Sequence, residues 1–227
     1  MRKQNDQTKK CAKGLWKAIG FLGAFFAWTA AVKGIDVQPI GAAGTEVGFA
    51  TLNGLFHRIT GVNWFLYHIT DWLSLIPIGV VFGFALLGLW QWIKRKKLGL
   101  VDRDLLVLGG FYLLVLAVYL LFEVWVINYR PVLINGALEA SYPSSTTMLM
   151  LCVMPTAAMQ MRERIRNKRV KQWILIGIFC FTAFMVLGRI WSGVHWISDI
   201  IGGVLLSAGL VESYRATSQF YKSRNCD

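Results

Sequence analysis

Long apolar runs separated by short basic clusters constrain this chain more than any other feature of its sequence. Several uncharged runs approach the ~20 residues that a helix needs to cross the hydrocarbon core of a bilayer. Of the 227 residues, 56% are hydrophobic and only 16% are charged, against roughly 25% charged in soluble domains. The pattern predicts an all-α polytopic membrane protein with one domain, residues 1–227.

Six transmembrane helices are expected from the apolar runs. They are roughly Leu15–Val32, Trp72–Ile93, Leu105–Ile127, Pro143–Met161, Trp173–Leu187 and Trp196–Val211. The first contains Lys17, whose ammonium must reach the interface, and it also resembles a signal peptide. We favour a retained span, because no segment after it has the composition of a soluble secreted domain.

The distribution of lysine and arginine predicts the orientation. Residues 1–17 hold six, 94–104 five, 162–171 six and 212–227 three, which is 20 of the 24. The positive-inside rule makes these segments cytoplasmic, including both termini and the basic segment 1–17. Although the net charge is +12, the clusters alternate with apolar runs, so we expect the bilayer and no nucleic acid as a partner. The expected location is the cell membrane.

One long outer connection, residues 33–71, mixes apolar and polar side chains. Two interpretations stay open for it: amphipathic helices lying in the outer interface, or a plain ordered loop. The four cysteines show no paired spacing, so we expect free thiols and neither a disulfide framework nor a metal site.

Five ionisable residues lie inside or beside the predicted spans: Glu123, Arg130, Arg189, His195 and Asp199. A charged group left unpaired in lipid is costly, so such residues indicate function by default. The predicted topology brings all five to the outer ends of three spans, whereas interfacial anchors would be scattered over both faces. An active site facing the extracellular side is therefore expected.

His195 and Asp199 stand four residues apart where the last span begins. That spacing predicts that the two side chains share one helix face, with the carboxylate holding one imidazole tautomer and leaving the other nitrogen free to attack. The alternative is a structural pair that caps the helix.

The segment 141–147 opens the fourth span with proline and hydroxyl side chains. Its free backbone N–H groups at Ser144 and Ser145 form an anion site in which Arg130 and Arg189 can hold phosphate oxygens. With His195 as nucleophile, charge neutralisation and in-line attack are both available without a metal-ligand cluster, and we expect no cofactor.

At these residues the chain resembles the type 2 phosphatidic acid phosphatases, a family of integral-membrane lipid phosphatases. The family's motifs are Lys-x6-Arg-Pro, Pro-Ser-Gly-His and Ser-Arg-x5-His-x3-Asp, and residues 123–199 carry the matches Arg130-Pro131, Pro143-Ser144, Arg189, His195 and Asp199. The resemblance, closest to Gram-positive bacterial members, implies a phosphohistidine on His195 and metal-independent hydrolysis of lipid phosphates or diphosphates in the cell envelope.

Three positions depart from the family pattern: Glu123 replaces the lysine, Gly188 the serine, and Thr146 the histidine that serves the family as general acid. Threonine has no proton to donate near neutral pH, and losing a general acid typically costs about 10²–10⁴ in rate. Either the chain is a natural pseudoenzyme, or Thr146 is an engineered change that silences an ordinary enzyme. We favour the engineered change, because an intact nucleophile and two arginines have little reason to persist in a decayed site.

The expected function is phosphate release from undecaprenyl diphosphate, phosphatidylglycerol phosphate or phosphatidic acid, in a chain silenced at Thr146. The alternatives are an inactive lipid-phosphate binder and a lipid transporter, although the spans show no polar trail toward the cytoplasm. Glu139 is close to the expected site, either as a solvated carboxylate or as a substitute acid. No obligate protein partner is inferred.

Overall fold

The computed structural model describes residues 2–223, and within this range the chain forms eight α-helices and no strand. The helices are α1 (Arg2–Gly34), α2 (Ala50–Thr60), α3 (Trp64–Leu73), α4 (Leu75–Arg95), α5 (Arg103–Val124), α6 (Ser145–Arg164), α7 (Lys168–Ser192) and α8 (Ile197–Ser223). Short 3-10 turns lie at Ala42–Gly44 and Leu98–Leu100. The all-α prediction is confirmed.

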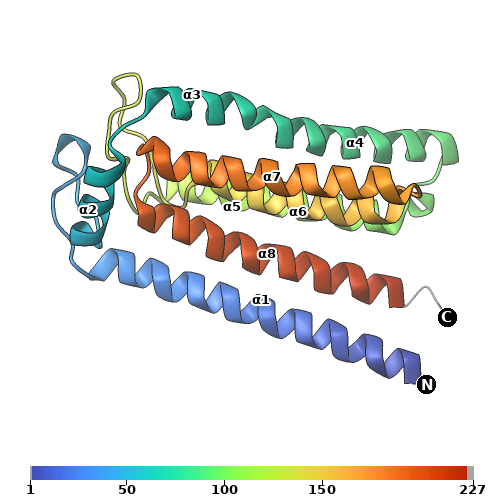
Figure 1. The fold of residues 1–227 in the computed structure, drawn as a ribbon. Helices are drawn as coiled ribbons and strands as arrows, with labels where there is room; N and C mark the ends of the chain where they lie inside the picture. Colours follow the sequence, from blue (N-terminus) through green and yellow to red (C-terminus); the bar gives the residue numbers. More distant parts are fainter. Residues whose placement is uncertain (1, 224–227) are drawn as a thin grey trace.

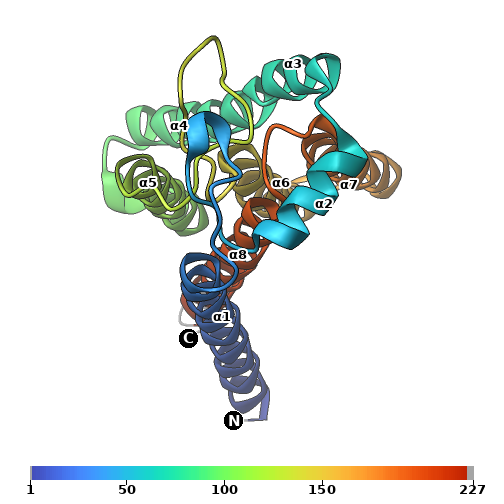
Figure 2. The ribbon, with the colours of Figure 1, turned by 90° about the vertical axis from the view of Figure 1, so that its left-hand side faces the viewer.

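The long helices run side by side along one axis, with α1 beginning and α8 ending at the same end of the bundle (Figure 1). The connections 35–63, 125–144 and 193–196 gather at the opposite end. Figure 2 looks at that end, with α1 outside the bundle against α8, and α2 lying across α7 and α8. The segments that carry the expected site residues therefore meet at one end.

Within the described part of the chain, five helices are long and apolar enough to cross a membrane: Cys11–Gly34, Trp64–Arg95, Arg103–Val124, Lys168–Ser192 and Ile197–Tyr221. The chain is thus a multi-pass membrane protein. The predicted fourth span, which corresponds to α6, does not meet these criteria of length and composition. Its buried face carries polar side chains such as Thr147, Thr156 and Gln160. Because α4, α5, α7 and α8 pack around α6, it needs less apolar surface than a lipid-facing helix.

The outer connection is helical at two places. The helix α2 buries Ala50 and Asn53 and is amphipathic, as one of the two interpretations predicted. The helix α3 instead runs almost continuously into α4, so this span begins at Trp64 and not at Trp72. The reason is local: Asn63 caps α3 by accepting a hydrogen bond from the Leu66 N–H at 3.0 Å.

Tyr142 anchors the segment that precedes α6. Its ring stacks on Phe25 with centroids 6.1 Å apart, and its hydroxyl shares a 2.6 Å hydrogen bond with Thr29 on α1. A methyl group at Gly202 would collide with this ring, so α8 passes close to Tyr142 only because glycine stands there. These contacts fix the backbone on which Ser141 and Ser144 lie.

Candidate active site

The turn 193–196 between α7 and α8 carries His195. Gly193 ends α7 in the left-handed region at φ 66°, and a side chain there would also strike the Gly61 carbonyl oxygen. The Asn63 N–H donates to the Ser192 carbonyl at 2.9 Å, and the Trp196 indole donates to the Tyr129 carbonyl at 2.8 Å. The turn is therefore held from both outer connections.

Asn53 connects α2 to the start of α8. It is fully buried, and its amide nitrogen donates to the Gly48 carbonyl at 2.7 Å and to the Ser198 hydroxyl at 2.9 Å. Its oxygen accepts from the Ser198 N–H at 3.2 Å. One side chain of the outer segment thus satisfies three polar groups and fixes α2 over the site.

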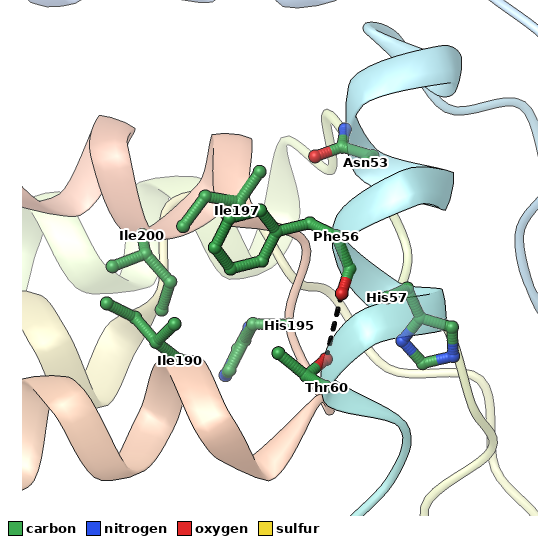
Figure 3. A pocket seen from close by; sticks show the side chains of 8 residues that line it. All are labelled: Asn53, Phe56, His57, Thr60, Ile190, His195, Ile197 and Ile200. Carbon is green, nitrogen blue, oxygen red and sulfur yellow. Dashed lines mark hydrogen bonds between the residues drawn. The ribbon is translucent and has the colours of Figure 1, made fainter.

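A small void behind His195 shows how closely α2 packs (Figure 3). The residues around it are Asn53, Phe56, His57, Thr60, Ile190, His195, Ile197 and Ile200. Its volume of about 10 Å³ is at the lower limit for one water molecule. The outer segment therefore closes this side of the imidazole against solvent.

His195 does not contact Asp199 directly, because Ser141 stands between them. The Ser141 hydroxyl lies 3.0 Å from Nδ1 of His195 and donates to Oδ2 of Asp199 at 2.5 Å. A hydroxyl has one hydrogen, and Asp199 receives it, so Ser141 accepts from the Nδ1–H of His195. The imidazole then carries its proton on Nδ1, and the lone pair of Nε2 is free.

The predicted helix-face contact between His195 and Asp199 is therefore wrong in detail. The helix α8 begins only at Ile197, so His195 lies in the preceding turn. The carboxylate of Asp199 instead accepts from the Trp196 N–H and from the Asn128 amide, each at 3.1 Å. Asp199 caps its own helix and orients Ser141 at the same time.

His195 is almost completely buried, and Nε2 has no hydrogen-bond partner within the described part of the chain. Burial, followed by the charges of Arg130 and Arg189, holds the pKa of His195 well below the ordinary imidazole value. The ring is therefore neutral at neutral pH, as a nucleophile requires.

Two buried guanidiniums lie near the imidazole. The side chain of Arg189 is 2% exposed, and its guanidinium lies over the Tyr67 ring. One terminal nitrogen of Arg189 donates to the Thr146 hydroxyl at 2.5 Å and to Asp71 at 3.4 Å. Arg130 forms an ion pair with Glu139 at 3.2 Å, beside the backbone bridge from the Arg130 N–H to the Glu139 carbonyl. Glu139 is thus the carboxylate that pairs with Arg130.

Each guanidinium retains unused hydrogen-bond donors. Nε of Arg130 faces Glu139 in their ion pair, but Nη1 of Arg130 and both Nε and Nη1 of Arg189 are buried without a hydrogen-bond partner among the described residues. Buried donors are almost always satisfied, and an unsatisfied one costs about 1–3 kcal/mol. Three such nitrogens beside one neutral imidazole indicate a site built for an anion.

Of the two serines expected to bind phosphate, only Ser145 faces the adjoining cavity. Ser144 is fully buried; its N–H donates to the Asp199 carbonyl at 3.1 Å and its hydroxyl accepts from Thr147 at 3.0 Å. Ser144 therefore joins α6 to α8, and its amide is unavailable to a ligand.

A groove of about 1640 Å³ runs from the arginines along the bundle between α4 and α5, with α6 at its back. At the site end it is lined by polar residues that include Tyr67, Asp71, Tyr119, Glu123, Tyr129, Arg130, Glu139, Thr146 and Arg189. Further along its walls are aliphatic and aromatic, from Ile78 to Trp92 on α4 and from Leu105 to Leu116 on α5. The groove combines a charged head with an apolar channel.

Asp102 closes the far end of this groove by joining α4 to α5. Its carboxylate accepts from Gln91 at 2.8 Å and pairs with Arg95 at 2.9 Å, and Arg164 of α6 lies 3.5 Å away. These contacts tie α4, α5 and α6 together at the end of the bundle away from the site.

Comparisons with known proteins agree with this geometry. The model of the PAP2 superfamily matches residues 111–220, which include both arginines, Ser141, His195 and Asp199. The crystal structure of a transmembrane PAP2-type phosphatidylglycerolphosphate phosphatase from Bacillus subtilis is similar, with a TM-score of 0.59 and 18% identity over 91% of this chain and 97% of that one. Among curated proteins no match is found.

The fold is thus that of a multi-pass helical membrane protein with a polar site at one end of the bundle. Residues 111–220 match the model of the PAP2 superfamily, which confirms the resemblance drawn from the motifs.

Sequence reasoning missed Ser141, Asn128, Asp71 and Asn53 as contributors to the site. Ser141 stands in a segment that was expected to reach the site, but only for its helix-start chemistry. Asn128 and Asn53 act through hydrogen bonds to residues far away in the chain, and no spacing along the sequence indicates them.

Proposed function

We propose that the protein removes a phosphoryl group from the head of a membrane lipid through a phosphohistidine on His195. The observation that carries the proposal is the Ser141 bridge, because it leaves Nε2 of a neutral imidazole unprotonated beside two guanidiniums with free donors. This is the arrangement that in-line attack on phosphorus requires.

Arg130 and Arg189 hold the phosphoryl oxygens and neutralise the charge that spreads over them in the transition state. The lone pair of Nε2 attacks phosphorus, the bond to the leaving oxygen breaks, and water then attacks the phosphohistidine to release phosphate. Ser141 and Asp199 keep the proton of His195 on Nδ1 in both steps. The two arginines supply the positive charge that a metal ion provides in other phosphatases, so metal-independent hydrolysis is part of the proposal.

The groove between α4 and α5 supports a lipid substrate. Its apolar walls suit acyl or isoprenoid chains, while the phosphorylated head lies at Arg130 and Arg189. Undecaprenyl diphosphate, phosphatidylglycerol phosphate and phosphatidic acid all have this form. We place the site at the outer face of the cell membrane, because the basic clusters lie at the other end of the bundle.

Thr146 is part of the proposal as the position that limits the reaction. It lines the groove and accepts a hydrogen bond from Arg189, so it contributes to phosphate positioning but not to proton donation. A chain without a proton donor there is expected to turn over poorly any substrate that needs one.

Phosphate release in detergent micelles tests the proposal, with His195→Ala as blank and a chelator present throughout. We expect release from at least one lipid phosphate or diphosphate that disappears in His195→Ala. Saturable binding of these lipids without any release would instead favour the lipid-phosphate binder.

A further inference from the structure

Arg130 and Arg189 line the groove, so a lipid whose phosphate they hold has its leaving oxygen on the groove side. Among the described residues that line the groove there is no histidine, lysine or cysteine. The ionisable side chains near its polar head are Tyr67, Asp71, Tyr119, Glu123, Tyr129, Arg130, Glu139 and Arg189. The question is which of these could give a proton to a departing oxygen.

The two carboxylates nearest the arginines are poor acids in this setting. Asp71 and Glu139 have side chains that are 54% and 42% exposed, and each pairs with an arginine. Both carboxylates are therefore already engaged as hydrogen-bond acceptors of a guanidinium.

The hydroxyl groups are weaker acids still. The Thr146 hydroxyl accepts a hydrogen bond from the same terminal nitrogen of Arg189 that also contacts Asp71. An aliphatic hydroxyl does not ionise in this pH range, and a phenol such as that of Tyr67 ordinarily titrates near pH 10. Among its described lining residues the groove therefore offers the leaving oxygen hydrogen bonds from hydroxyl groups and guanidiniums, and no imidazole that could give it a proton.

Leaving groups differ in how much they need that proton. A phosphate monoester of a lipid alcohol expels an alkoxide, and general acid catalysis typically contributes about 10²–10⁴ to such a step. A lipid diphosphate expels a lipid monophosphate, whose second pKa is about 6, so it leaves as a stable anion without being protonated. The free donors on Arg130 and Arg189 can also hold a second phosphoryl group.

We infer that this site selects lipid diphosphates and stops at the lipid monophosphate. The inference rests on the proposed function and adds its substrate class. Nε2 of His195 attacks the terminal phosphorus, and the electron pair of the bridging P–O bond leaves on the lipid monophosphate. Water then supplies hydroxide to the phosphohistidine and one proton to solvent, which frees inorganic phosphate and restores the imidazole.

Dodecyl diphosphate and dodecyl phosphate test the inference, because they share one tail and differ only in the leaving group. The unaltered chain should hydrolyse the diphosphate at least about 100-fold faster in kcat/KM, and dodecyl phosphate should accumulate in equal amounts with phosphate. Equal rates, or a preference for dodecyl phosphate, in a His195-dependent reaction would overturn the inference and leave the proposed function intact. No release from either substrate would overturn both.

Thr146→His supplies a second readout, because it places a proton donor in the groove. It should raise dodecyl phosphate hydrolysis by about 10²–10⁴ and dodecyl diphosphate hydrolysis by less than about tenfold. Thr217→His, on the exposed surface near the end of α8, is the matched control and should change neither rate. Parallel gains on both substrates would contradict the argument from the leaving group.

Discussion

Replacing Ser141 with alanine removes the hydroxyl that connects His195 to Asp199. The Nδ1–H of His195 then loses its acceptor in a site where Ser141 and His195 are 2% and 5% exposed. Asp199 keeps its hydrogen bonds from Trp196 and Asn128, so the helix start remains supported. The change should therefore act on the tautomer and orientation of the imidazole.

The size of the effect follows from the hydrogen bonds that are lost. Hydrogen bonds to charged groups contribute about 1.5–3 kcal/mol, and the Ser141 bridge joins the imidazole to a carboxylate at 2.5 Å. With about 1.4 kcal/mol for each factor of ten in rate, Ser141→Ala should lower kcat by about 10- to 100-fold. KM should change little, because Ser141 does not line the groove and the arginines are untouched.

Phosphate release from dodecyl diphosphate gives kcat and KM for this variant. Ser207→Ala is the control, since Ser207 is equally buried on α8 and donates to the Met148 carbonyl at 3.5 Å, not to His195 or Asp199. It should leave kcat within about twofold. Ser141→Thr keeps a hydroxyl and should recover much of the loss. A Ser141→Ala protein with unchanged kcat, or with a loss confined to KM, would refute the positioning role.

Three further predictions address the outer segment, the groove and the imidazole. Asn53→Ala removes three buried hydrogen bonds, each of which contributes about 1 kcal/mol. Tm should therefore fall by about 5–10 °C in a thermal unfolding assay. An unchanged Tm would contradict the conclusion that Asn53 fixes α2 over the site. Gly109→Phe places a ring in the groove, at a position where a Cβ atom would meet no atom within 4 Å. The ring should displace about two methylenes of the lipid tail, so KM should rise about tenfold for dodecyl diphosphate and stay unchanged for propyl diphosphate. Gly20→Phe on α1 is the control and should raise KM for neither substrate. Because burial and two arginines hold the pKa of His195 well below 6.5, its ring nitrogens should not titrate in nitrogen-15 NMR spectra between about pH 7.5 and 6, and a midpoint near 6.5 would contradict the description of the site.

The helical bundle could largely be predicted from the sequence because apolar length is a local property. Five of the expected spans correspond to helices that meet the criteria for crossing a membrane. The remaining expected span, α6, carries Thr147, Thr156 and Gln160 on a face that its neighbours cover. Composition alone does not distinguish such a buried helix from a polar helix at the surface. The helix α3, which lengthens the second span, begins at a cap on Asn63 that hydropathy does not indicate.

The site was predictable as a set of residues but not as a set of contacts. Charged residues are costly near lipid, so Arg130, Arg189, His195 and Asp199 were conspicuous. Their partners were not, because Ser141 reaches His195 and Asp199 only through the folding of the 125–144 connection over α8. Spacing along one helix suggested a direct pair, whereas the observed turn before Ile197 separates the two residues.

The phosphohistidine is the most direct test of the mechanism. The protein would be mixed with dodecyl diphosphate, quenched with alkali within one turnover, digested and examined by mass spectrometry, with His195→Ala treated in parallel. The account predicts one phosphoryl group on the peptide that contains His195, lost on longer incubation as phosphate appears. Turnover with no phosphorylated intermediate, or with the phosphoryl group on another residue, would contradict His195 as the nucleophile.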